Sequence, residues 1–397
     1  MGQLEVEAHK VVRCKTVEFD SRSDLFEGTA SRERFKSSNF KELALDLSAV
    51  MSDRNAATML NRMRREENGI IPTTLRNNVE REGMAIKSQK EELAEEALLA
   101  NGFTVDAELT QPERVDKDEA KHISYETVQK AADAIGVKHF DQCDYEDIEA
   151  SVNVSIDDVG VKRQSEMRPK DKGEEQPKRV NNTVIHVQHG SRKCLLNSTS
   201  IPSAIKLLLG LLLNDNLLGK QLVFFTDGAR DIHSWINKLF AFANFKIILD
   251  WYHLCKKCRE QMSMIMYGSK ARNSFLDKLL PCLWQGDVDG AIELIRGLEQ
   301  KMVRNQELLD KLIEYLIRVR LYIPNYALRK ELGLRNSSNL GEKANDLLVA
   351  NRQKHNGMSW SNSGSLAFAT VTAAIYNGEL PQFIHNGYIS LKMPLAA

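Results

Sequence analysis

Apolar positions along the chain follow two periods, one typical of helices and one typical of strands. Between residues 40 and 50 they recur at three- and four-residue steps, and residues 52–65 continue the helical pattern after Ser52, a residue type that caps helices. A third helix is predicted to begin at Pro72 and to stop at Gly83. Three short helices with tight turns and several arginines indicate a helix-turn-helix unit, and an ordinary helical bundle explains them nearly as well.

The second half of the chain reads as strands and helices in alternation. Residues 151–161 alternate in strand fashion, and short apolar runs predict further strands at 183–187, 194–196, 222–225 and 245–249, with helices at 201–218 and 229–243. This order predicts an α/β fold whose functional face lies at the strand ends. From residue 253 to residue 322 the period is helical throughout, so this stretch is expected to be an inserted all-helical subdomain.

These patterns divide the chain into four parts. An N-terminal segment (1–36) precedes a helical, helix-turn-helix-like DNA-binding region (37–90) and an acidic helical linker (91–150). The linker is expected to contain helices at 91–100 and 124–134. The last part (151–397) is the expected catalytic domain, with its helical insertion at about 253–338 and a polar loop at 162–178.

The net charge of zero conceals an uneven distribution of charged side chains. Residues 91–158 contain 19 acidic and 5 basic residues, a net charge of −14, so the rest of the chain carries +14. Lys and Arg gather at 160–195, nine against four acids, and at 316–356, eight against three. Local potential decides whether a polyanion binds, so the neutral total does not exclude a nucleic-acid partner, although such charge runs are more often solvated surfaces.

The apolar segments are too short for a membrane protein. The best run, residues 207–213, has seven residues and includes Gly210, and residues 1–10 carry charges where a signal peptide needs an apolar stretch. Six cysteines in 397 residues do not make a disulfide scaffold. We therefore expect a reducing, intracellular setting and no membrane association.

Three acidic residues lie where an acid needs a partner. Asp157 lies in the apolar part of the first predicted strand, Asp227 directly follows the run Leu-Val-Phe-Phe-Thr at 222–226, and Glu342 begins a helix after a Ser/Asn-rich turn. A carboxylate in a buried strand is costly unless it is paired or metal-bound. Mg²⁺ relieves repulsion among converging carboxylates, and two such ions about 4 Å apart catalyse phosphodiester displacement. Taken singly, each acid could also be a plain turn or capping residue.

The sequence around these acids resembles a known family. Residues 342–364, with Glu-Lys-Ala-Asn at 342–345, Arg352 and Gly-Met-Ser-Trp-Ser at 357–361, resemble the carboxy-terminal signature of bacterial insertion-sequence DDE transposases, closest to the Kra and Lre groups. Residues 223–229 (VFFTDGA) are similar to the second-Asp motif of that family, and residues 154–158 (VSIDD) to its first-Asp strand. Residues 250–253 (DWYH) resemble the Asp-x-x-His motif of the wider Mutator-like superfamily.

The resemblance implies a fold and a metal site. The fold would be α/β, an RNase H-like mixed sheet flanked by helices with an all-helical insertion and an N-terminal helical region. Asp157, Asp227 and Glu342 would bind two Mg²⁺ ions, with Mn²⁺ as a substitute. The family usually has Asp-Gly where this chain has Asp157-Asp158, so either aspartate could be the first ligand, and Asp157 is the one that aligns.

The Asp-x-x-His motif is implied to belong to the same site. Asp250 and His253 are three residues apart and share a face in a helical turn. By resemblance they are catalytic residues that help to position the scissile strand, although His253 could instead be a core or capping residue. Cys255 and Cys258 follow, but one Cys-x-x-Cys without a second pair does not predict a zinc site.

Four residues are candidates for DNA binding. Arg76 lies in the helix-turn-helix-like region, and Arg352 and Lys354 follow Glu342 along its helix, where they could contact phosphates or be solvated charges. Trp251 could stack on an unpaired base, but an aromatic residue at this position is more often part of the core.

Together these expectations describe a transposase that cleaves transposon ends and joins them to target DNA. Its partners would be terminal inverted repeats, target DNA and a second copy of the chain, because two ends must be brought together. Its location would be the bacterial cytoplasm, at the nucleoid. Two alternatives remain: an RNase H-like nuclease without strand transfer, and a transposase-derived DNA-binding protein that has lost catalysis.

Overall fold

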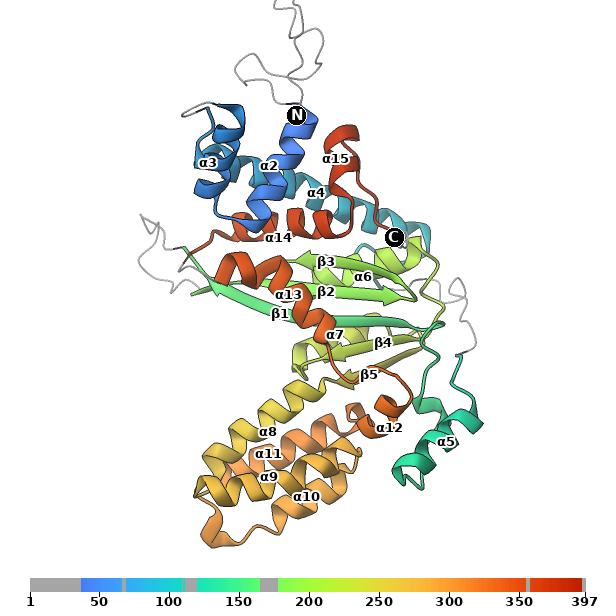
Figure 1. The fold of residues 1–397 in the computed structure, drawn as a ribbon. Helices are drawn as coiled ribbons and strands as arrows, with labels where there is room; N and C mark the ends of the chain where they lie inside the picture. Colours follow the sequence, from blue (N-terminus) through green and yellow to red (C-terminus); the bar gives the residue numbers. More distant parts are fainter. Residues whose placement is uncertain are drawn as a thin grey trace, which may run out of the picture.

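The computed structural model describes residues 37–65, 69–108, 110, 120–164, 178–354 and 358–394 (Figure 1). The predicted N-terminal segment and most of the predicted polar loop lie outside these residues. None of the helices described is both long and apolar enough to cross a membrane.

Five strands form one mixed sheet in the order β3-β2-β1-β4-β5. β1 pairs with β2 in antiparallel and with β4 in parallel orientation, β3 is antiparallel to β2, and β5 is parallel to β4. The strand bounds are β1 Val152–Lys162, β2 Arg179–His189, β3 Arg192–Ser198, β4 Leu222–Thr226 and β5 Phe245–Leu249. The predicted α/β class is confirmed. β2 is longer than expected because its pairing with β1 continues through polar residues at its start.

One face of the sheet is covered by a continuous layer of helices. The alternate residues Val152, Val154 and Ile156 of β1 point into an apolar cluster with side chains of the helices α6, α7 and α4. These helices are α6 Ile201–Asn214, α7 Arg230–Leu239 and the carboxyl-terminal part of α4 Pro72–Ala100. α6 and α7 correspond to the helices predicted at 201–218 and 229–243, and each ends four residues earlier than predicted.

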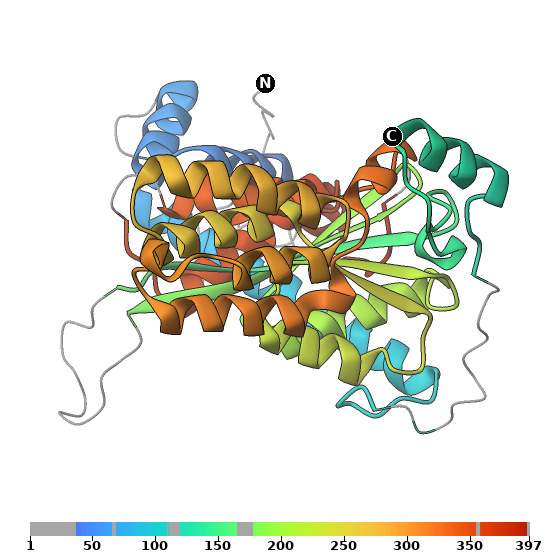
Figure 2. The same ribbon diagram turned by 90° about the horizontal axis from the view of Figure 1, so that it is seen from below.

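The opposite face is covered by two separate helix groups (Figures 1 and 2). Over β1 to β3 lie α13 Asn339–Asn345, the π-helix η5 Asp346–Lys354 and α14 Asn362–Tyr376. Over β4 and β5 lie the helices of the predicted insertion: α8 Trp251–Ile265, α9 Ser269–Trp284, α10 Val288–Arg296 and α11 Gln306–Val319. We call the line between β1 and β4, where the two groups meet, the seam.

The N-terminal helices pack on the C-terminal ones. α2 Ser38–Val50 and α3 Asp53–Arg64 begin at serine caps, as predicted for Ser52. The helix from Pro72 does not stop at Gly83 but continues to Ala100, so the expected boundary at residue 90 falls inside α4. Gly83 lies where α4 crosses α14, and a Cβ there would come within 2.3 Å of the Ala367 carbonyl oxygen. This glycine therefore permits a close helix crossing and does not end a helix.

The end of the acidic linker packs on the exit of the insertion. α5 Tyr125–Ile135 lies within one residue of the helix predicted at 124–134, is capped by Ser124, and shares a small core with α12 Tyr326–Glu331. Beside this core, Arg329 and Glu146 form an ion pair that is 0% and 1% exposed. The remaining elements are α15 Leu380–Asn386 and the short 3-10 helices η2 Gln142–Asp144, η3 Gln300–Met302 and η4 Arg320–Tyr322.

Candidate active site

Asp157 and Asp227 come from neighbouring parallel strands. The last paired residues of β1 and β4 are Ser155 and Phe225, and each aspartate lies two residues further on, so both stand at the same level and on the same face. Burial and the nearby charge of Asp227 raise the pKa of Asp157. Two like charges this close disfavour each other, and a cation between them would relieve the cost.

The backbone around Asp227 turns sharply after β4. The Ala229 amide donates to Asp227 Oδ1 at 2.8 Å, which fixes the carboxylate at the start of the loop. Gly228 has a φ of +85°, and a Cβ there would lie 2.8 Å from a methyl group of Leu249 in β5. The predicted Asp-Gly turn therefore needs its glycine both for the backbone conformation and for space.

Asp250 lies directly after β5 and accepts hydrogen bonds with both of its carboxylate oxygens. It is fully buried and caps α8, accepting from the His253 amide at 2.8 Å, while His253 Nδ1 lies 3.2 Å from the same Oδ1. Its other oxygen, Oδ2, accepts from the backbone amide of Ser338 and from the Ser338 hydroxyl at 2.9 Å. These hydrogen bonds lower the pKa of Asp250 against the opposing effect of burial.

His253 faces the other carboxylates across the seam. The bond to Asp250 raises its pKa, and the charges of Asp157 and Asp227 act in the same direction. When the ring is protonated, its charge partly offsets the acidic charge around it. Asp250 and His253 were expected to share a face of a helical turn, and the structure places them in contact at the start of α8, with Asp250 as the cap.

Glu342 lies on α13, on the same side of the sheet. Burial raises its pKa, the charge of Asp250 adds to this effect, and the charge of His253 opposes it. α13 can approach β1 because residue 341 is glycine: a Cβ there would come within 2.8 Å of Ser155 Cβ. One turn beyond Glu342, the Asn345 amide donates to Asp157 Oδ2, which joins α13 to β1 at the site.

Asp157, Asp227 and Asp250 all act electrostatically on His253, whereas the largest charge effects on Glu342 come from Asp250 and His253 and not from the other two aspartates. Among the described residues, no three Asp, Glu, His or Cys side chains are already close enough to hold a metal ion together. The side chains at the seam are nonetheless carboxylates together with the Asn345 amide, and oxygen atoms of these groups are the ligands that Mg²⁺ prefers.

Asp157 and Asp158 differ in the face of the sheet on which their side chains lie. Neighbouring residues of a strand point to opposite faces, and only Asp157 lies on the face that carries α13. Asp158 is exposed and accepts from the Thr183 hydroxyl at 3.1 Å. Asp157 is therefore the better placed of the two for a site shared with Glu342.

Arg352 does not have the surroundings of a phosphate-binding residue. It is 5% exposed, its guanidinium pairs with Asp53 at 3.2 Å, and its Nε donates to the Met51 carbonyl at 2.9 Å. Its guanidinium also lies 5.6 Å from the Trp360 ring centroid. The expectation that Arg352 contacts DNA is therefore corrected: this arginine attaches α3 to the C-terminal helices.

The other three DNA-binding candidates have different surroundings. Trp251 packs edge-to-face on Trp284, with ring centroids 4.8 Å apart, and joins the core of the insertion, so its alternative role in packing is the one observed. Lys354 is exposed on η5. Arg76 is exposed on α4.

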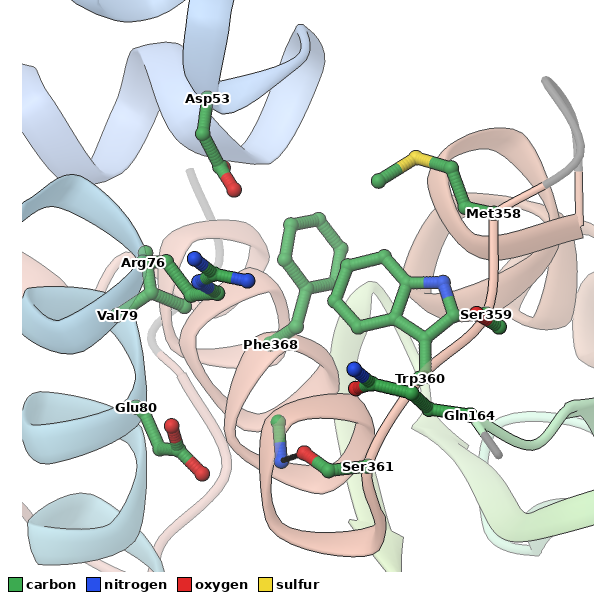
Figure 3. Close-up of a pocket in the computed structure, with 11 residues that line it drawn as sticks. Asp53, Arg76, Val79, Glu80, Gln164, Met358, Ser359, Trp360, Ser361 and Phe368 are labelled. Atoms are coloured by element: carbon green, nitrogen blue, oxygen red, sulfur yellow. Dashed lines mark hydrogen bonds between the residues drawn. The ribbon is translucent and has the colours of Figure 1, made fainter. Parts of the chain in front are cut away.

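Arg76 borders a small pocket away from the strand ends. Figure 3 shows this pocket, which has a volume of about 90 Å³ and lies between α3, α4 and the start of α14. Trp360 and Phe368 form its apolar wall, and Asp53 and Glu80 stand on the same rim as Arg76. A phosphate at Arg76 would therefore also meet two carboxylates.

Two residues that hold the site together were not among the predicted site residues. Ser338 binds Asp250 and Asn345 binds Asp157, and both side chains are buried. A signal for each was present in the sequence. Asn345 belongs to the Glu-Lys-Ala-Asn block, one helical turn from Glu342, and Ser338 lies in the turn that leads to Glu342.

Two buried histidines make stability depend on pH. Burial lowers the pKa of His233, whose Nε2 lies 2.6 Å from the Thr226 hydroxyl next to Asp227, and of His186 in β2, each from 6.5 to about 4. The unfolded chain therefore binds more protons between these values, and stability is lost as the pH falls from about 6.5 to about 4. The loss is up to about 3 kcal/mol for each histidine.

Urea unfolding at several pH values would measure this effect. His233→Gln is expected to flatten the dependence over that interval, and His139→Gln, at an exposed histidine, is expected to leave it unchanged. Equal slopes for the wild type and His233→Gln would show that His233 does not titrate as stated.

Comparison of the chain with protein-family models, with curated proteins and with solved structures finds no match in any of the three.

Proposed function

We propose that the chain is an RNase H-like DDE transposase that cleaves and joins DNA at the seam. The observation that carries this proposal is the placement of Asp157 and Asp227 side by side, each two residues beyond the last residue that pairs β1 with β4, with Glu342 on a helix joined to β1. The mixed sheet with helices on both faces, and the helical insertion between β5 and α13, agree with the fold that the sequence resemblance implies.

The residues of the site have distinct roles in this proposal. Asp157, Asp227 and Glu342 would hold the ions, and Asn345 and the Ala229 amide orient the first two carboxylates. When bound, Mg²⁺ would activate the attacking hydroxyl and stabilise the leaving oxygen of a phosphodiester. Asp250 contacts the His253 ring, and in this proposal the protonated imidazole would donate to a phosphate oxygen of the scissile strand.

A cleavage and joining assay tests the proposal. The purified chain would be incubated with labelled duplexes taken from the DNA that flanks its gene, with plasmid as target, in Mg²⁺, Mn²⁺ or EDTA. We expect metal-dependent cleavage at the duplex ends and covalent transfer of the label to the plasmid. Cleavage without transfer would identify a nuclease, and binding without cleavage in either metal would identify a DNA-binding protein that has lost catalysis.

A further inference from the structure

The insertion places an aromatic residue and two cations beside Asp227. Tyr315 of α11 lies with its hydroxyl 3.4 Å from the position that a Cβ on Gly228 would take, so it stands directly over the Asp-Gly turn. The Arg318 guanidinium lies 5.3 Å from the centroid of the Tyr315 ring, and Lys257 Nζ of α8 lies 5.6 Å from the same centroid. α8 and α11 lie side by side in the insertion (Figure 2).

Neither cation has a carboxylate partner in the part of the chain that the structure describes. Arg318 donates from both terminal nitrogens to the Gly228 carbonyl at 3.4 Å, and the ion pairs of the insertion are made by other residues. Lys257 is exposed and Arg318 is half-buried. By contrast, Lys311 on the same helix as Arg318 pairs with Glu307 at 2.5 Å.

Two cations without counter-charges are unusual next to a group of acids, because the nearest acid would ordinarily pair with them. Here Arg318 donates to the backbone carbonyl of Gly228, the residue after Asp227, and both cations lie within cation–π distance of the Tyr315 ring. An arginine held in this way presents its remaining N–H groups in a planar fork, the arrangement that matches two oxygens of a phosphate.

We propose that Arg318 and Lys257, which both lie near the Tyr315 ring, bind a backbone phosphate of the DNA strand that enters the seam beside Asp227. The inference rests on the proposed function and extends it, because it gives the helical insertion a direct part in binding the scissile strand. The phosphate bound here would be a neighbour of the one that reacts at the carboxylates. The interaction is with the backbone, so it would position the strand without reading its sequence.

The test is the salt dependence of DNA binding. Binding of a fluorescein-labelled duplex of about 30 base pairs would be followed by anisotropy over a range of KCl at fixed Ca²⁺, for the wild type, Arg318→Ala, Lys257→Ala and the control Lys311→Ala. Removing one cation that binds a phosphate should reduce the slope of log K against log salt by about 1. We expect that reduction, with weaker binding, for the first two variants and neither change for Lys311→Ala.

A purely structural role for Arg318 would give a different result. In that case Arg318→Ala would lower the melting temperature and leave the salt slope unchanged, and Lys257→Ala, at an exposed position, would change nothing; this pair of results overturns the inference. If that pair of results is found while the wild type cleaves DNA in Mn²⁺ and Asp227→Asn does not, the proposed function stands and only this inference fails. If the wild type neither binds nor cleaves DNA, the proposed function fails and this inference fails with it.

Discussion

Asp227→Asn is expected to lower the rate of metal-dependent DNA cleavage by more than about 100-fold. Even the loss of a residue that only hydrogen-bonds to a metal ligand lowers activity or metal affinity by about 10- to 100-fold. The substitution keeps the shape of the side chain and the hydrogen bond from the Ala229 amide, but removes the negative charge that a cation needs beside Asp157. Nicking of supercoiled plasmid in Mn²⁺ provides the rate, and calorimetric titration with Mn²⁺ provides the affinity.

Although Asp227→Asn should lower activity, it should not lower stability. Without bound metal, Asp227 repels Asp157, so its neutralisation should leave the free energy of unfolding unchanged or increase it. Asp231→Asn is a matched control, because Asp231 is an exposed acid four residues away in the first turn of α7. An Asp227→Asn protein that cleaves as fast as Asp231→Asn would refute the catalytic assignment, whatever its stability.

The strands and the acids at their ends could be predicted because their pattern is local. The buried strand β5 was predicted with its bounds unchanged, and β4 differs by one residue, since short apolar runs between helices have few other interpretations. Asp227 and Asp250 directly follow such runs, and the parallel order of the strands then brings them to one edge of the sheet. The positions of these two acids could therefore be predicted from the local sequence.

Features that depend on distant parts of the chain could not be predicted in the same way. Gly83 has the composition signal of a helix end, but its partner in space is Ala367, nearly three hundred residues later, and that contact keeps the helix continuous. α14 was missed because it is buried on nearly every side and so has no polar face to give a helical period. Arg352 was a phosphate-binding candidate because it follows Glu342 along the helix, whereas its partner is Asp53, about three hundred residues earlier.

The buried ion pair of Arg329 and Glu146 also joins residues that are far apart in the sequence. Its loss is expected to cause the largest change in stability. The two guanidinium nitrogens bind the two carboxylate oxygens at 2.9 and 2.5 Å, and Nε donates to the Arg335 carbonyl at 3.0 Å. The pair joins the segment before β1 to the segment after the insertion. Both halves of the chain must therefore fold before either charge is neutralised.

Arg329→Met is expected to lower the free energy of unfolding by about 3–5 kcal/mol, because it leaves the buried Glu146 with only a longer contact to Lys246, at 3.9 Å, among the described residues. Arg320→Met, which breaks the exposed pair with Asp289, should cost at most about 1 kcal/mol. The double variant Glu146→Leu/Arg329→Met should recover much of the loss, because removing both charges also removes the cost of burying either one. Chemical denaturation of the four proteins measures these differences, and an Arg329→Met loss no larger than that of Arg320→Met would contradict the assignment of this pair as a fully desolvated one.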